Sequence, residues 1–115
     1  TTAAAAAPEG FVKDSMDLMR RHLSREFSIA ELSSRYSLNR QYFSTAFRRK
    51  TGHTPLGFLH GLRLEVAQRL LAGGESVART SAAVGFEDPF YFSRLFRRKM
   101  GCSPQQFQRA QRRRS

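Results

Sequence analysis

The sequence predicts an all-α fold of about seven helices, in which two helix-turn-helix subdomains are joined by a long linker helix. Two observations favour this fold. Residues 42–55 return as residues 91–104 at a constant offset of 49, with nine of the fourteen positions identical, which indicates an internal repeat. Between the two copies, residues 55–72 carry apolar side chains with the period of one long helix.

Each copy of the repeat is predicted to be a helix with a defined start and end. Apolar side chains recur at i, i+3 and i+4 on one helical face: Phe43, Ala46 and Phe47 in the first copy, and Phe92, Leu95 and Phe96 in the second. Gly52 and Gly101 fit the left-handed residue that ends many helices. In each copy a hydroxyl residue and a proline follow, which together begin the next helix.

The opposite face of each repeated helix is mainly polar and basic. It consists of Arg40, Gln41, Ser44, Thr45, Arg48 and Arg49 in the first copy, and of Pro89, Phe90, Ser93, Arg94, Arg97 and Arg98 in the second. Such a face suits a DNA major groove, because Arg and Gln can hydrogen-bond base edges and Arg also binds phosphate. An ordinary solvated face is the alternative for a single helix, and the presence of two similar copies weighs against it.

Two further helices are predicted upstream of the first copy. The apolar residues of the first recur at spacings of four, three and four: Val12, Met16, Met19 and Leu23. This pattern predicts a helix that ends near residues 24–25. Ser28 and Glu31 have the spacing of a capping box, which opens a short helix. A turn at residues 36–38 follows, and Asn39 is expected to cap the first repeated helix.

The linker helix is predicted at residues 55–72 and spans roughly 27 Å at about 1.5 Å per residue, long enough to hold two subdomains apart. Its inner side is apolar: Phe58, Leu59, Leu62, Val66, Ala67, Leu70 and Leu71. Ser76 is expected to cap the next short helix, Gly85 to form its turn, and residues 88–89 to start the second repeated helix. A last helix is expected to open at residues 105–108.

These elements divide the chain into five segments: residues 1–10 as a linker or tail, 11–53 as the first helix-turn-helix subdomain, 54–74 as the linker helix, 75–110 as the second subdomain, and 111–115 as a frayed basic tail. The first residue is Thr and not Met, so we expect the chain to be a piece of a longer protein.

The charge of the chain predicts a polyanionic partner. Twenty basic and nine acidic residues give a net charge of +11. Residues 39–51 contain four basic residues and no acid, and residues 89–115 contain eight basic residues and no acid. Positive charge therefore follows the two repeated helices, as an electrostatic footprint on DNA requires.

Other function classes fit the residues poorly. The three histidines are scattered, and there is no carboxylate pair or glycine-rich phosphate loop, so we expect no enzyme, no catalytic or metal site and no cofactor. Cys102 is the single cysteine, which fits a reducing cytoplasm. No apolar run approaches membrane-spanning length and no signal peptide is visible, so no membrane partner is expected.

Residues 28–109 resemble the DNA-binding domain of the AraC/XylS family of bacterial transcription regulators. The resemblance is strongest in three short runs: Gly85-Phe86, Phe92-Ser93-Arg94-Leu95-Phe96-Arg97 and Gly101-Cys102-Ser103-Pro104. It implies two recognition helices inserted into successive major grooves of double-stranded DNA. It also implies regulation of transcription, often by activation through contact with RNA polymerase, and an effector-binding domain upstream of this chain.

The resemblance also assigns roles to residues. Base-contacting positions of the family fall on Gln41, Ser44 and Thr45 in the first subdomain, and on Phe90, Ser93 and Arg94 in the second. Phosphate contacts are expected from Arg40, Arg48, Arg49, Arg97 and Arg98, and from backbone amides at the helix starts.

The chain departs from the family pattern in three places. Thr80-Ser81 stands where the family prefers Ile-Ala, which predicts looser packing of the second subdomain. Ser37 stands at a turn position where Gly is frequent. Phe90 replaces a polar residue, and its ring can either contact a thymine methyl group or be covered by protein.

One alternative function stays open, namely a basic helical module that binds nucleic acid without sequence preference. Gln41, Thr45 and Arg94 distinguish the two hypotheses. Replacing a residue that reads bases changes specificity, whereas replacing a phosphate contact lowers only affinity and the salt dependence.

Overall fold

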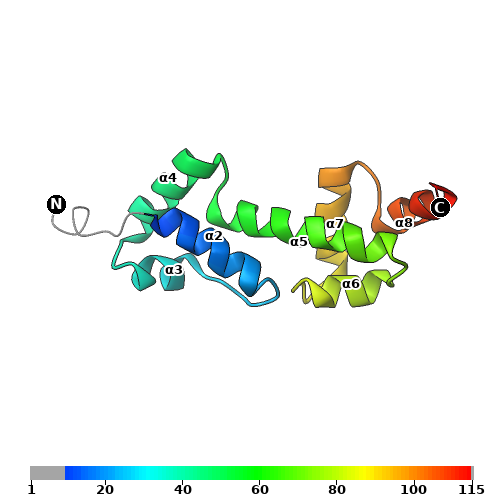
Figure 1. Cartoon of the computed structure of the whole chain (residues 1–115), viewed down its shortest axis with the longest axis horizontal. Coiled ribbons are helices and arrows are strands. Elements are labelled where there is room, and N and C mark those ends of the chain that lie inside the picture. The colour runs from blue at the N-terminus through cyan, green and yellow to red at the C-terminus, as the bar shows by residue number, and fades with distance from the viewer. Residues whose placement is uncertain (1–9, 115) are drawn as a thin grey trace. The chain divides into compact units, whose positions relative to one another are not determined.

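The computed structural model describes residues 10–114, which form seven helices and no strand. In chain order these are α2 (Phe11–Arg21), α3 (Ile29–Arg35), α4 (Arg40–Thr51), α5 (Pro55–Ala72), α6 (Val77–Ala83), α7 (Pro89–Met100) and α8 (Pro104–Arg114) (Figure 1). The predicted all-α class is confirmed. The chain divides into two compact units, residues 1–60 and 61–115, so the boundary lies within α5.

The core of the first unit is a series of aromatic rings that runs along the inner face of α4. Phe43 and Phe47 are fully buried, with ring centroids 6.0 Å apart. Phe11 of α2 packs on Phe43 at 5.7 Å, and Phe58 of α5 meets Phe47 edge-on at 5.7 Å. The rings therefore join α4 to the helices on either side of it.

The second unit repeats the buried pair and its edge-on partner with the equivalent residues, and Phe86, from the turn before α7, takes the place of Phe11. Phe92 and Phe96 of α7 are fully buried, with ring centroids 5.8 Å apart. Phe86 packs on Phe92 at 5.4 Å, and Phe107 of α8 meets Phe96 edge-on at 5.5 Å. Phe107 corresponds to Phe58 at the offset of the repeat. The sequence repeat is thus a repeat of core packing.

The ends of the two repeated helices follow the sequence signals. The Asn39 side chain accepts the backbone N–H of Tyr42 at 2.7 Å, and the Asp88 side chain accepts the backbone N–H of Phe90 at 2.9 Å. Gly52 and Gly101 end α4 and α7 in the left-handed conformation, with φ of 80° and 81°. Both helices therefore have the bounds that the repeat predicted.

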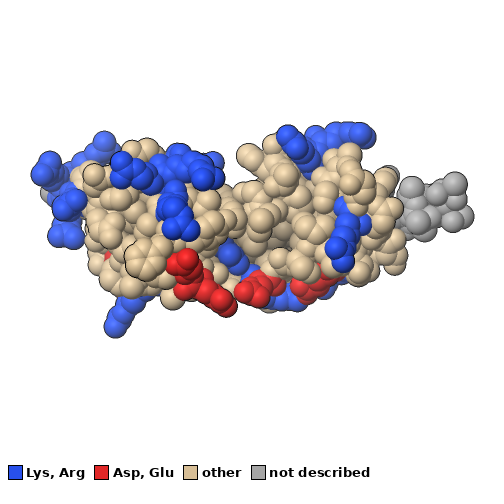
Figure 2. All heavy atoms as spheres, turned by 180° about the vertical axis from the view of Figure 1, so that it is seen from behind, with Lys and Arg blue, Asp and Glu red and all other residues tan. Residues whose placement is uncertain are grey.

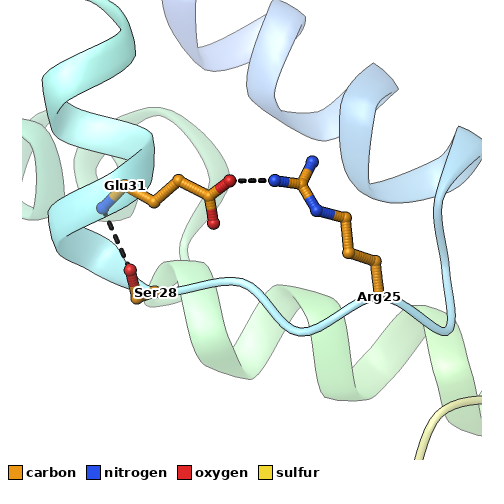
Figure 3. Close-up of polar contacts among 3 residues, drawn as sticks. All are labelled: Arg25, Ser28 and Glu31. Atoms are coloured by element: carbon orange, nitrogen blue, oxygen red, sulfur yellow. Dashed lines mark hydrogen bonds and ion pairs between the residues drawn. The ribbon is translucent and has the colours of Figure 1, made fainter.

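The capping box at the start of α3 is only half formed. The Ser28 hydroxyl accepts the backbone N–H of Glu31 at 3.0 Å, as expected. The Glu31 carboxylate, however, pairs with the guanidinium of Arg25 instead of reaching back to Ser28 (Figure 3). The loop before α3 brings a full positive charge to the carboxylate, and a charged donor binds it more strongly than a neutral backbone N–H does.

Four predicted details of the helices were wrong. α2 ends at Arg21, so Leu23 lies beyond it, and Ser15 is fully buried where Met16 was expected. The Ser15 hydroxyl donates to the Phe11 carbonyl at 2.8 Å, which lets a polar residue lie in the core. The buried side of α5 also includes Arg63 and Leu64, which the apolar pattern did not contain.

The fourth difference concerns the C-terminal residues, because α8 continues to Arg114 where a frayed tail was expected. Arg112 donates to the Gln108 side chain one turn earlier, at 3.3 Å. The last turn is basic, and positive charge there is favourable toward the negative end of the helix dipole. The predicted linker or tail at residues 1–10 lies outside the described residues except for Gly10, which precedes α2.

Ser37 has a backbone conformation that favours glycine. Its φ is 56°, whereas the equivalent turn residue of the second unit is Gly85 with a φ of 100°. A left-handed conformation costs a residue with a Cβ atom about 1–2 kcal/mol. We therefore predict that Ser37→Gly raises the free energy of unfolding by about 0.5–1 kcal/mol, the balance left after glycine's greater freedom in the unfolded chain.

Urea denaturation followed by circular dichroism measures this effect. The matched variant is Gly85→Ser, which should lower stability because it introduces a Cβ atom at a positive φ. A loss of stability in Ser37→Gly would show that the Ser37 side chain makes a contribution larger than the backbone strain.

Thr80 is a second residue that lowers the stability of the fold. Its side chain is fully buried, and its hydroxyl oxygen has no hydrogen-bond partner among the described residues. Ser81 beside it is also buried, but its hydroxyl donates to the Phe86 carbonyl at 3.3 Å. We predict that Thr80→Val, which keeps the shape, raises the free energy of unfolding by about 1 kcal/mol, because an unsatisfied buried hydroxyl is removed.

Ser81→Ala is the control for this prediction and should lower stability by a similar amount, because it deletes a hydrogen bond that is made. Both changes are read from thermal and urea unfolding. An unchanged or lower free energy of unfolding in Thr80→Val would contradict the prediction that the buried Thr80 hydroxyl destabilises the fold.

Candidate nucleic-acid interface

The buried phenylalanines of α4 determine which residues face outward. With Phe43 and Phe47 in the core, Gln41, Ser44 and Thr45 lie on the other side of the helix. Gln41 and Thr45 are exposed, and Ser44 is half-buried. The three predicted base-contacting residues of the first subdomain therefore share one face.

Two of these side chains are already held in place. The Gln41 amide nitrogen donates to the Thr45 hydroxyl at 3.2 Å, across one turn of α4. The pair is exposed, so its remaining hydrogen-bonding capacity is directed to solvent or to a ligand. An amide and a hydroxyl fixed side by side suit the donor and acceptor pattern of base edges in the major groove.

The equivalent face of α7 has a different chemistry. Ser93 is half-buried and Arg94 is exposed. The guanidinium of Arg94 lies over the ring of Tyr91, 5.9 Å from its centroid, and that ring packs edge-on against Phe86 at 6.1 Å. The buried core of the second unit thus supports Arg94 through Tyr91.

Phe90 is the most exposed large apolar side chain given for the described residues, with 74% of its surface accessible. Other residues of the described range 10–114 therefore do not cover this ring, in contrast to one of the two alternatives. Phe90 is the second residue of α7, and its backbone N–H donates to the capping carboxylate of Asp88. The ring is presented at the start of the helix, beside Ser93 and Arg94 on the next turn.

The five arginines expected to bind phosphate are all exposed: Arg40, Arg48, Arg49, Arg97 and Arg98. None of them forms an ion pair with an acid of the described residues. Neither α4 nor α7 contains an acidic residue, and each ends in a basic last turn. Figure 2 shows Lys and Arg at the surface of both units, with Asp and Glu in small groups apart from most of them. These guanidinium groups are available to an anion.

Sequence reasoning missed the role of Tyr91. The signal was present, because Tyr91 and Arg94 are three residues apart and such residues are neighbours on a helix. What the sequence lacked was the position of Phe86, which comes from the preceding turn and orients the tyrosine ring.

Residues 10–114 contain no group of three or more His, Cys, Asp or Glu side chains that could hold a metal ion. Within the same range, no helix is both long and apolar enough to cross a membrane.

Comparison with known proteins agrees with this geometry. Residues 32–110 match a family model described as a helix-turn-helix domain. The MmsAB operon regulatory protein of Pseudomonas aeruginosa is 42% identical over 88 residues, covering 75% of this chain and 28% of that protein. The transcriptional activator RhaS of Escherichia fergusonii is 34% identical over 86 residues, covering 74% of this chain and 31% of that protein. The chain thus spans less than a third of the length of these relatives.

A solved structure is similar over nearly the whole chain. It is the DNA-binding domain of the global transcriptional factor AdpA in complex with a target DNA, with a TM-score of 0.84 and 33% identity, covering 90% of this chain and 94% of that one. The C-terminal domain of the response regulator AraT from Geobacillus stearothermophilus shares the fold at a TM-score of 0.81 and 24% identity. On its two helix-turn-helix units and these matches, the chain belongs to the AraC/XylS family of DNA-binding domains.

Proposed function

We propose that this chain binds double-stranded DNA at specific sequences to regulate transcription, with α4 and α7 as recognition helices in successive major grooves. The observation that carries the proposal is the repeated outer face of α4 and α7. In each case two buried phenylalanines anchor the helix, and exposed side chains that can contact bases or phosphate face outward. The AdpA domain, solved with a target DNA, supports this use of the fold.

Roles divide along each helix. Gln41, Ser44 and Thr45 contact bases in one major groove, and Phe90, Ser93 and Arg94 contact bases in the next. The guanidinium groups of Arg40, Arg48, Arg49, Arg97 and Arg98 bind flanking phosphates, together with backbone N–H groups at the helix starts. Major grooves on one face of a duplex recur about every 34 Å, or roughly ten base pairs.

The experiment that tests this function is a selection from random double-stranded oligonucleotides. The Kd is then measured against salt for the selected duplex and for a scrambled one. Two sequence blocks about ten base pairs apart, bound far more tightly than the scramble, are expected. Equal Kd values for both duplexes would favour the second candidate, a charge-driven binder without sequence preference, for which the net charge of +11 is the supporting observation.

Residues that read bases and residues that bind phosphate should respond differently to mutation. We predict that Arg94→Ala changes the selected sequence in one block and weakens binding to the original duplex by about 1–3 kcal/mol, because an arginine can bind a base edge bidentately. Gln41→Ala should alter the other block. Competition binding with single-base variants of the duplex measures both effects.

Arg97→Ala is the matched control on α7 and should weaken binding to every duplex alike, reducing the salt slope by about one. A uniform loss of affinity in Arg94→Ala, with the sequence preference unchanged, would place Arg94 among the phosphate contacts instead.

We further propose that the chain works within a longer cytoplasmic regulator, with an effector-binding domain upstream and contact with RNA polymerase that leads to activation. The greater length of the relatives and the activator RhaS among them support this proposal. Transcription in vitro from a promoter carrying the selected site, with and without the protein, distinguishes activation from repression.

A further inference from the structure

The recognition helix of the second unit carries an apolar ring where the first carries an amide. Phe90 and Gln41 are equivalent at the offset of 49, and each is the second residue of its helix. Gln41 donates to Thr45, whereas Arg94, at the corresponding spacing of four residues from Phe90, lies over the ring of Tyr91. The same scaffold therefore presents two different chemical surfaces.

The exposure of Phe90 leaves its ring available for contact with a partner. With 74% of its surface accessible, the side chain contributes little to the core of the second unit. Its ring stacks on none of the other described aromatic rings, in contrast to Tyr91, which packs on Phe86. Binding of a ligand that covers a large exposed apolar side chain is favourable, because apolar surface is removed from water.

The chemistry of the major groove limits what that ligand surface can be. Base edges there present hydrogen-bond donors and acceptors, and the one apolar group among them is the 5-methyl group of thymine. A phenyl ring offers no donor or acceptor to the other groups, and placing it against them would desolvate them without compensation.

We propose that Phe90 selects thymine by its 5-methyl group in the part of the DNA site bound by α7. This inference rests on the proposed function, since it requires α7 to lie in a major groove. Arg94, held against Tyr91, supplies hydrogen bonds to neighbouring base edges, and the ring of Phe90 supplies the apolar contact beside it. The first unit has the amide of Gln41 at the same position, which binds base edges by hydrogen bonds instead.

The test replaces thymine by deoxyuridine, which removes the 5-methyl group and leaves base pairing intact. Each thymine of the selected duplex is replaced in turn, and the Kd is measured with the whole chain. The block read by α7 is identified beforehand as the one that changes in Arg94→Ala. One substitution in that block is expected to weaken wild-type binding about fourfold, the effect of exposing one methyl-sized group.

The Phe90→Ala variant decides whether Phe90 is responsible. It should bind the thymine and deoxyuridine duplexes equally, and Phe90→Leu should keep part of the difference. Because Phe90 is exposed, both variants are expected to fold, which circular dichroism checks. Gln41→Ala is the matched control at the equivalent position, and it should leave the fourfold effect intact.

Two outcomes would overturn the inference while leaving the proposed function standing. One is a duplex bound specifically but insensitive to deoxyuridine throughout the α7 block. The other is a deoxyuridine effect of equal size in wild type and Phe90→Ala. That result would show that Phe90 does not contact the methyl group, and a protein partner would then be the candidate for covering the ring. Equal binding of wild type to selected and scrambled duplexes would overturn the proposed function itself, and this inference with it.

Discussion

The structure depends on a pair of phenylalanines one helical turn apart, which occurs once in each unit. Phe43 and Phe47 in α4, and Phe92 and Phe96 in α7, are fully buried and meet rings from neighbouring helices or, for Phe92, from the turn before α7. Burial of an aromatic pair fixes the rotation of a helix about its axis, because any other rotation would expose two large rings to water. The outward direction of every candidate DNA-contacting side chain follows from that rotation.

Because of this fixed rotation, each twelve-residue helix has an inner face that stabilises the fold and an outer face available for recognition. The inner positions of α4 and α7 are identical at both phenylalanines, while the outer positions differ at Gln41 and Phe90 and at Thr45 and Arg94. Exposed positions can change without a packing penalty, whereas buried positions cannot. A duplicated unit can therefore keep one fold and acquire two different contact surfaces.

Where the sequence-based interpretation was incomplete, the cause was a side-chain contact that the motif or the apolar period does not include. The capping box at Ser28 and Glu31 has the correct spacing, but Arg25 lies outside the motif and takes the carboxylate. Apolar periodicity favoured Met16 over Ser15 because it does not count hydrogen bonds, and the Ser15 hydroxyl donates to the Phe11 carbonyl one turn earlier. Arg63 is buried in α5 although it is charged, with its guanidinium over the ring of Phe86.

The sequence by itself determined the class of fold, the bounds of α4 and α7, the family and the candidate contact residues. The fold class and the helix bounds depend on neighbours along the chain: helical period, capping residues and glycine at the helix end. The family and the assignment of contact residues came from the resemblance of short sequence motifs to those of known regulators. Only the tertiary structure decided that Phe90 is exposed, that Tyr91 supports Arg94 and that Thr80 has a buried hydroxyl without a described partner. Exposure and side-chain pairing depend on which distant segments pack against a residue, and a local pattern does not carry that information.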